Sequence, residues 1–128
     1  MKVREIYTPG LATIRPTDTL VQAAQTMVLG SLGALLVEGE NTVEGIVTEA
    51  DLVGAIALDI DVRSAPVSDH LSPSLETIDL DDDARNAANR MRLGHFRHLV
   101  VTQDGRMIGV VSMRDIAALV GDDVSPEP

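Results

Sequence analysis

The stretch "GIVTEADL", residues 45–52, occurs a second time in altered form as "GVVSMRDI", residues 109–116. In both copies a glycine opens a short apolar run, and an aspartate lies six residues after that glycine. An apolar run followed by Thr or Ser and, three residues later, by Asp is typical of a buried strand that leads into a capped helix. The sequence therefore predicts the same strand-to-helix junction at two places in the chain.

The two junctions belong to a longer internal repeat. When the sequence is shifted by 64 positions, it aligns with itself without a gap over nearly the whole repeat. Such self-similarity indicates that one supersecondary unit is used twice. We expect a pseudo-two-fold axis to relate the copies. The first repeat is assigned to residues 1–60 and the second to residues 61–122, with a flexible tail at residues 123–128.

Each repeat predicts a strand, a helix, two strands and a second helix, a βαββα order. The predicted fold class is therefore mixed α/β (α+β), with small sheets packed on helices. In the first helix the apolar residues follow helical spacing, which we interpret as one buried face. These residues are Leu20, Ala23, Ala24, Met27 and Val28.

Residues typical of helix ends and of turns mark where these elements begin and end. Thr19 and Gln22 have the spacing of a capping box, and Asp83 is the expected N-cap of the corresponding helix in the second repeat. Glycines suit the ends of both helices, at Gly30 and Gly94. The pair Asp104-Gly105 predicts a two-residue hairpin turn.

Composition excludes several classes of function. The formal net charge of the 128 residues is −10, so we expect no general electrostatic binding to nucleic acid or to an anionic membrane. There is no cysteine, which excludes disulfides, thiol catalysis and thiolate metal sites. No apolar stretch of the sequence is long enough to span a bilayer. We expect a cytoplasmic protein.

The repeat resembles a tandem pair of cystathionine-β-synthase (CBS) domains, also called a Bateman module. The matching segments are "VREIYTPGLATIRPTDTLVQAAQTM" with "GIVTEADL", and "VSDHLSPSLETIDLDDDARNAANRM" with "FRHLVV" and "GVVSMRD". The resemblance implies a regulatory, ligand-sensing module that dimerises through its helices and acts on a partner protein in trans. Its implied ligand is adenosine-containing: AMP, ADP or ATP, with S-adenosylmethionine less favoured, bound in clefts between the repeats. We expect no cofactor to be required.

The resemblance also assigns roles to individual residues. It implies that Thr48 and Ser112 contact phosphate and that Asp51 and Asp115 contact ribose. The alternative is that these four residues only cap their helices. Ile14 and Ile78 correspond to apolar contacts with adenine, and the alternative for both is a place in the core.

The two repeats differ most in charge. Arg97 and His98 precede a predicted strand where some nucleotide-binding relatives carry a basic pair, whereas the first repeat has Gly33-Ala34 there. Arg114 follows Ser112, whereas Glu49-Ala50 follows Thr48. Because a phosphate favours basic neighbours, we expect the second-repeat site to bind a polyphosphate better.

The sequence leaves one other function open, a constitutive dimerisation or scaffold module with empty clefts. No nucleophile and base occur in a recognisable setting, so we expect no catalytic residues and no enzymatic activity. The three histidines lack completing ligands, so no metal site is expected. A homodimer is expected, because small residues that allow close packing line the helices at Ala23, Ala24, Ala87, Ala88 and Gly54-Ala55.

Overall fold

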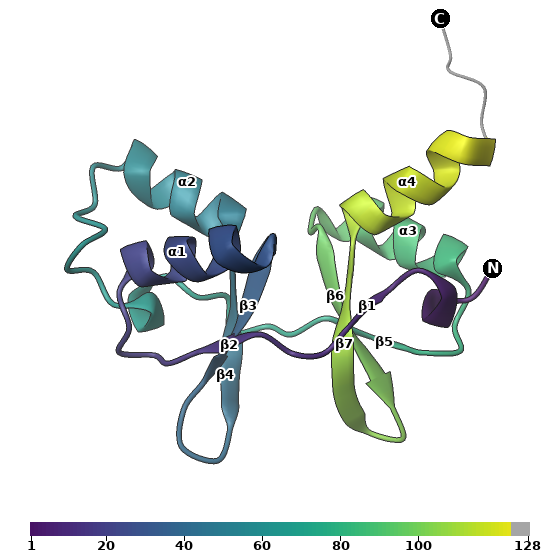
Figure 1. The fold of residues 1–128 in the computed structure, drawn as a ribbon, viewed down its shortest axis with the longest axis horizontal. Coiled ribbons are helices and arrows are strands. Elements are labelled where there is room, and N and C mark those ends of the chain that lie inside the picture. The colour runs from purple at the N-terminus through teal and green to yellow at the C-terminus, as the bar shows by residue number, and fades with distance from the viewer. Residues whose placement is uncertain (124–128) are drawn as a thin grey trace, which may run out of the picture. The chain divides into compact units, whose positions relative to one another are not determined.

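The computed structural model describes residues 1–123, so the tail expected at residues 123–128 lies almost wholly outside the described residues. The chain forms two compact units (Figure 1). The first-repeat unit is Ala12–Leu75, and the second-repeat unit joins Met1–Leu11 to the chain from Glu76 onward. The predicted mixed α/β class is confirmed, and so is the predicted order of a strand, a helix, two strands and a helix in each unit.

The first-repeat unit is a three-stranded sheet packed on two helices. The strand order is β2-β3-β4, with β2 parallel to β3 and β3 antiparallel to β4. The helices α1 and α2 contact one another. The elements are β2 (Thr13–Ile14), α1 (Leu20–Gly30), β3 (Ala34–Glu38), β4 (Val43–Thr48), α2 (Glu49–Ala57) and a 3-10 turn η2 (Val67–Asp69).

The second-repeat unit has the same plan and one added strand. Its strand order is β1-β7-β6-β5, with α3 and α4 in contact. The elements are a 3-10 turn η1 (Val3–Glu5), β1 (Thr8–Pro9), β5 (Thr77–Asp79), α3 (Ala84–Gly94), β6 (His98–Gln103), β7 (Arg106–Ser112) and α4 (Met113–Asp123). No helix among the described residues has the length and apolarity needed to cross a bilayer.

The predicted caps and the predicted turn are confirmed. Thr19 and Gln22 form a complete capping box at the start of α1. Asp83 accepts a hydrogen bond from the backbone N–H of Arg85 at the start of α3, at 2.7 Å. Asp104 and Gly105 have φ angles of 52° and 79°, which are the two left-handed positions that a two-residue type I′ hairpin requires.

The buried face of α1 is narrower than predicted. Leu20, Ala23 and Met27 lie in the core, but Val28 is 78% exposed, so its assignment to the buried face was wrong. A helix that packs on one sheet and one neighbouring helix buries a limited arc, and Val28 lies outside this arc.

The helices α1 and α3 end at the predicted glycines, Gly30 and Gly94. Neither glycine itself adopts the left-handed φ that glycine tolerates. The left-handed residue is the following one, Ser31 with φ 54° and His95 with φ 58°. The chain then folds back over the glycine. A Cβ at Gly30 would lie 2.9 Å from Cδ1 of Leu32, and a Cβ at Gly94 would overlap the ring of Phe96.

The structural units exchange segments relative to the sequence repeats. Residues 1–11, the N-terminal arm, pack in the unit formed by the second repeat, and residues 65–75, the internal arm, pack in the unit formed by the first. The two arms make equivalent hydrogen bonds. The N–H of Val3 donates to the carbonyl of Asp82 at 2.9 Å, and the N–H of Val67 donates to the carbonyl of Asp18 at 2.7 Å.

Each arm pairs with a strand of the sheet at or next to the glycine of the repeated junction. Pro9 of the N-terminal arm pairs with Gly109 in β7, and Ser72 of the internal arm bridges to Ile46, next to Gly45 in β4. A Cβ on Gly109 would overlap the carbonyl oxygen of Thr8, and a Cβ on Gly45 would overlap the carbonyl oxygen of Ser72. Glycine is therefore required in both copies because another backbone passes where a side chain would begin.

We predict that Gly45→Ala and Gly109→Ala each destabilise the fold by about 1–3 kcal/mol, because the added methyl group displaces a hydrogen-bonded backbone. Gly54→Ala in α2 is the matched control, since a Cβ there meets nothing within 4 Å. In a helix this change is expected to stabilise by about 0.5–1 kcal/mol. Urea unfolding of the three variants measures the differences. Equal effects at the three positions would contradict the close approach.

Candidate functional site

The repeated junction in the second-repeat unit is a closed capping arrangement. The backbone N–H of Ser112 donates to Oδ2 of Asp115 at 2.8 Å, and the Ser112 hydroxyl donates to the same oxygen at 3.0 Å. In return the backbone N–H of Asp115 donates to Oγ of Ser112 at 3.1 Å. Both side chains are half-buried. The capping interpretation of this pair is therefore confirmed.

The junction in the first-repeat unit makes the same two hydrogen bonds to its aspartate. The backbone N–H of Thr48 donates to Oδ2 of Asp51 at 2.8 Å, and the Thr48 hydroxyl donates to it at 3.1 Å. Both side chains are again half-buried. The sequence repeat is therefore a repeat of local geometry as well as of residue type.

A carbonyl from the neighbouring strand completes each helix start. The N–H of Met113, the first residue of α4, donates to the carbonyl of Arg97 at 2.8 Å. In the other unit the N–H of Glu49 donates to the carbonyl of Gly33 at 3.0 Å. These bonds satisfy one of the four N–H groups that a helix leaves unpaired at its start. They also bring the residue before β6, or before β3, to the cap.

The register of the sheet brings a second residue close to each cap. In the antiparallel pair of β6 and β7, His98 lies opposite Ser112, and in the pair of β3 and β4, Ala34 lies opposite Thr48. Residues directly opposite on antiparallel strands have Cβ atoms about 4.5–5.5 Å apart. The structure thus brings Arg97 and His98 together with Ser112 and Asp115 within one unit.

The surroundings of the two caps differ in charge. Around the α4 cap lie the exposed Arg97 and Arg114 and the half-buried His98. The corresponding positions at the α2 cap are Gly33, Ala34 and the exposed Ala50.

The first residue of each helix also differs between the two caps. It is the exposed acid Glu49 in α2 and the uncharged Met113 in α4. The chain positions nearest the start of α4 therefore carry two arginines, and those nearest the start of α2 carry a glutamate.

The two isoleucines lie in the cores of their units. Ile14 is 7% exposed in the cluster that includes Leu20 and Val47, and Ile78 is 3% exposed in the cluster that includes Val3 and Val111. These positions agree with the core alternative, and contact of either isoleucine with adenine stays a prediction. Among residues 1–118, whose side chains the structure describes, no group of three or more His, Asp or Glu side chains is placed to hold a metal ion.

Sequence reasoning missed two features of the site. One is the use of the Arg97 and Gly33 carbonyls to close the helix starts, for which a carbonyl leaves no signal in the residue type. The other is the arm that lies against Gly109 in β7 and the equivalent arm at Gly45. The glycine that recurs in both copies was the only sequence signal of that approach.

Comparison with known proteins identifies relatives along most of the chain. A protein-family model described as the CBS domain matches residues 3–58 and residues 67–122. An uncharacterised 17.7 kDa protein of Acidianus ambivalens is 34% identical over 124 residues, which cover 94% of this chain and 74% of that protein.

Solved structures with the same fold are also found. A CBS-domain containing protein from Agrobacterium tumefaciens has a TM-score of 0.86 at 26% identity, covering 93% of this chain and 98% of that one. A CBS domain protein from Pyrobaculum aerophilum, solved in complex with AMP, has a TM-score of 0.80 at 23% identity, covering 95% and 97% of the two chains. At this level of identity, the similarity to the Pyrobaculum aerophilum protein shows that the two chains share a fold.

Proposed function

This chain belongs to the CBS domain family and carries two copies of the domain, and from this premise we propose that it is a regulatory module that senses an adenine nucleotide. The nucleotide binds at the start of α4, and the module acts on a partner protein. One observation carries the proposal. The carbonyl of Arg97 accepts a hydrogen bond from the N–H of Met113, the first residue of α4, and this places Arg97 next to the Ser112–Asp115 cap. The AMP complex of the Pyrobaculum aerophilum protein supports the ligand class.

The α4 cap has groups suited to both halves of such a ligand. The positive end of the helix dipole and the guanidinium groups of Arg97 and Arg114 favour a phosphate chain. The carboxylate of Asp115 uses Oδ2 for the cap. A carboxylate has a second oxygen with its own lone pairs, so Oδ1 can accept hydrogen bonds from ribose hydroxyls while the cap stays intact.

The charge difference leads to unequal sites. Glu49 at the start of α2 opposes a phosphate chain, and Gly33-Ala34 supply no cation there. We therefore assign polyphosphate binding to the α4 cap. The α2 cap is left for a less charged adenosyl ligand, or for no ligand.

We predict that Asp115→Ala weakens ATP binding at least tenfold, whereas Asp51→Ala changes it less than threefold, on the scale of one lost charge-assisted hydrogen bond. The two variants are matched, because each removes the same pair of cap hydrogen bonds. Calorimetric titration of ATP into both proteins measures the difference. Equal losses would contradict the assignment to α4.

A second pair of variants separates charge from capping. Arg97→Ala is expected to lower the affinity for ATP more than the affinity for AMP. Arg106 is an exposed arginine elsewhere on the same sheet, and Arg106→Ala is expected to change neither affinity.

The scaffold alternative is tested by thermal unfolding of the unmodified protein. A ligand at 100 times its Kd adds about 2.7 kcal/mol of stability. No shift with AMP, ATP or S-adenosylmethionine would favour the scaffold.

We also propose a homodimer built on the helices of the first-repeat unit. Ala23 and Ala55, two of the small residues expected at the interface, lie in the core instead. The apolar side chains left exposed on these helices are larger. On α1 they are Val28 and Leu29, and on α2 Val53 and Ile56, with exposed fractions between 63% and 88%. A two-fold axis would place this surface against its own copy.

We predict that Ile56→Lys converts the dimer to a monomer, because it places a charge in the contact and removes about 2 kcal/mol of apolar burial per protomer. The monomer fold should persist, since Ile56 is 63% exposed within the chain. Light scattering coupled to gel filtration gives the mass. Gln103→Lys, at the exposed end of β6, adds the same charge and should leave the dimer intact. A dimer that persists in Ile56→Lys would exclude this surface.

A further inference from the structure

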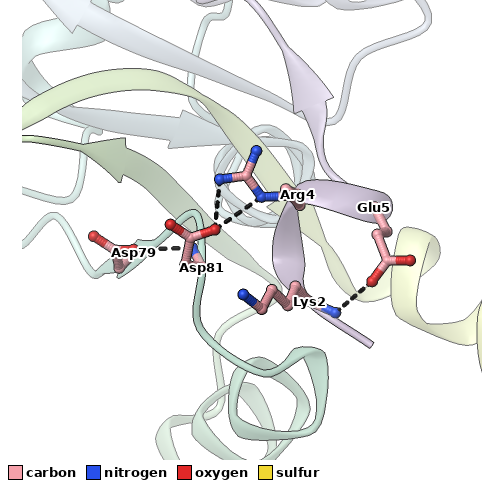
Figure 2. Close-up of polar contacts among 5 residues, drawn as sticks. All are labelled: Lys2, Arg4, Glu5, Asp79 and Asp81. Carbon is pink, nitrogen blue, oxygen red and sulfur yellow. Dashed lines mark hydrogen bonds and ion pairs between the residues drawn. The ribbon is translucent and has the colours of Figure 1, made fainter.

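The N-terminal arm is held to the second-repeat unit at two places. At the first, Val3 is fully buried in the core. The N–H groups of Val3 and Arg4 donate to the carbonyls of Asp82 and Leu80, at 2.9 and 3.0 Å. The guanidinium of Arg4 contacts Oδ1 of Asp81 through Nε, at 2.8 Å, and through a terminal nitrogen (Figure 2).

The ion pair between Arg4 and Asp81 is found in the N-terminal arm and has no equivalent in the internal arm. The internal arm repeats the hydrogen bonds of the N-terminal arm, because Val67 and Ser68 donate to the carbonyls of Asp18 and Pro16. However, Ser68 occupies the position of Arg4, and Thr17 occupies the position of Asp81. The N-terminal arm therefore carries an added electrostatic contact that the internal arm lacks.

At the second place the arm pairs with β7, the strand that leads into the proposed site. Thr8 and Pro9 lie opposite Val110 and Gly109, and the N–H of Gly10 donates to the carbonyl of Ile108 at 2.9 Å. This ladder ends only a few residues before Ser112. β1 has two residues, both exposed, and it is the edge strand of its sheet. A short edge strand with few buried contacts is a segment expected to open at a lower free energy than the core.

We infer that docking of the N-terminal arm is coupled to occupancy of the α4 site, so that the arm reports the bound nucleotide. The inference rests on the proposed function. A ligand held by Ser112 and Asp115 restrains the junction of β7 and α4, and β7 is the surface on which β1 docks. Coupling between two such equilibria is reciprocal. Bound nucleotide raises the equilibrium constant for docking of the arm by some factor. Undocking the arm must therefore lower the affinity for nucleotide by the same factor.

Amide hydrogen exchange of the full chain, with and without saturating ATP, tests the coupling. ATP is expected to slow exchange at Val3, Arg4 and Gly10, whose N–H groups hold the arm, by about threefold or more. The N–H groups of Val67 and Ser68 in the internal arm are the matched control and should change less. ATP binding, shown by calorimetry, without slower exchange in the arm would overturn the inference and leave the proposed function standing. No ATP binding would overturn both.

The reciprocal effect is tested with Arg4→Ala, which lies outside the proposed nucleotide site. An exposed ion pair changes an equilibrium by at most about fivefold, so ATP affinity is expected to fall by up to that factor while exchange in the arm becomes faster. Arg63→Ala removes the same charge from an exposed loop of the other unit and should change neither quantity. Faster arm exchange in Arg4→Ala with unchanged ATP affinity would overturn the coupling.

Discussion

The close approach of two backbones at Gly45 and Gly109 is the constraint on which the rest of the structure depends. At each glycine an arm from the other sequence repeat passes where a Cβ would lie. The approach lets Val3 and Val67 enter the two cores, where both are fully buried. Neither unit is therefore made from a single sequence repeat, and the stability of each depends on residues that lie far away along the chain.

The same junction shows how one local geometry can serve two chemical purposes. A serine or threonine, an aspartate three residues later and a carbonyl just before β6 or β3 close the helix start in both units. What distinguishes the copies is their neighbours, above all Arg97 and Arg114 against Glu49.

Local features were predictable from the sequence, and long-range pairing was not. The caps at Thr19 and Asp83 and the Asp104-Gly105 turn depend on a few adjacent residues, whose side chains and φ angles have known preferences. Val28 was misplaced because helical spacing gives the direction of an apolar face and not its width. The pairing of β1 with β7 joins residues about one hundred positions apart, and its signal in the sequence is limited to the glycine that recurs in both copies.

We propose that the charge around a repeated cap decides which copy binds nucleotide. A crystal structure of the protein grown with ATP is the test of this proposal. We expect the phosphate chain to lie against Arg97 and Arg114 at the start of α4, with the ribose hydroxyls on Asp115. Phosphates seated instead at the start of α2 beside Thr48, or no nucleotide at either cap, would contradict it.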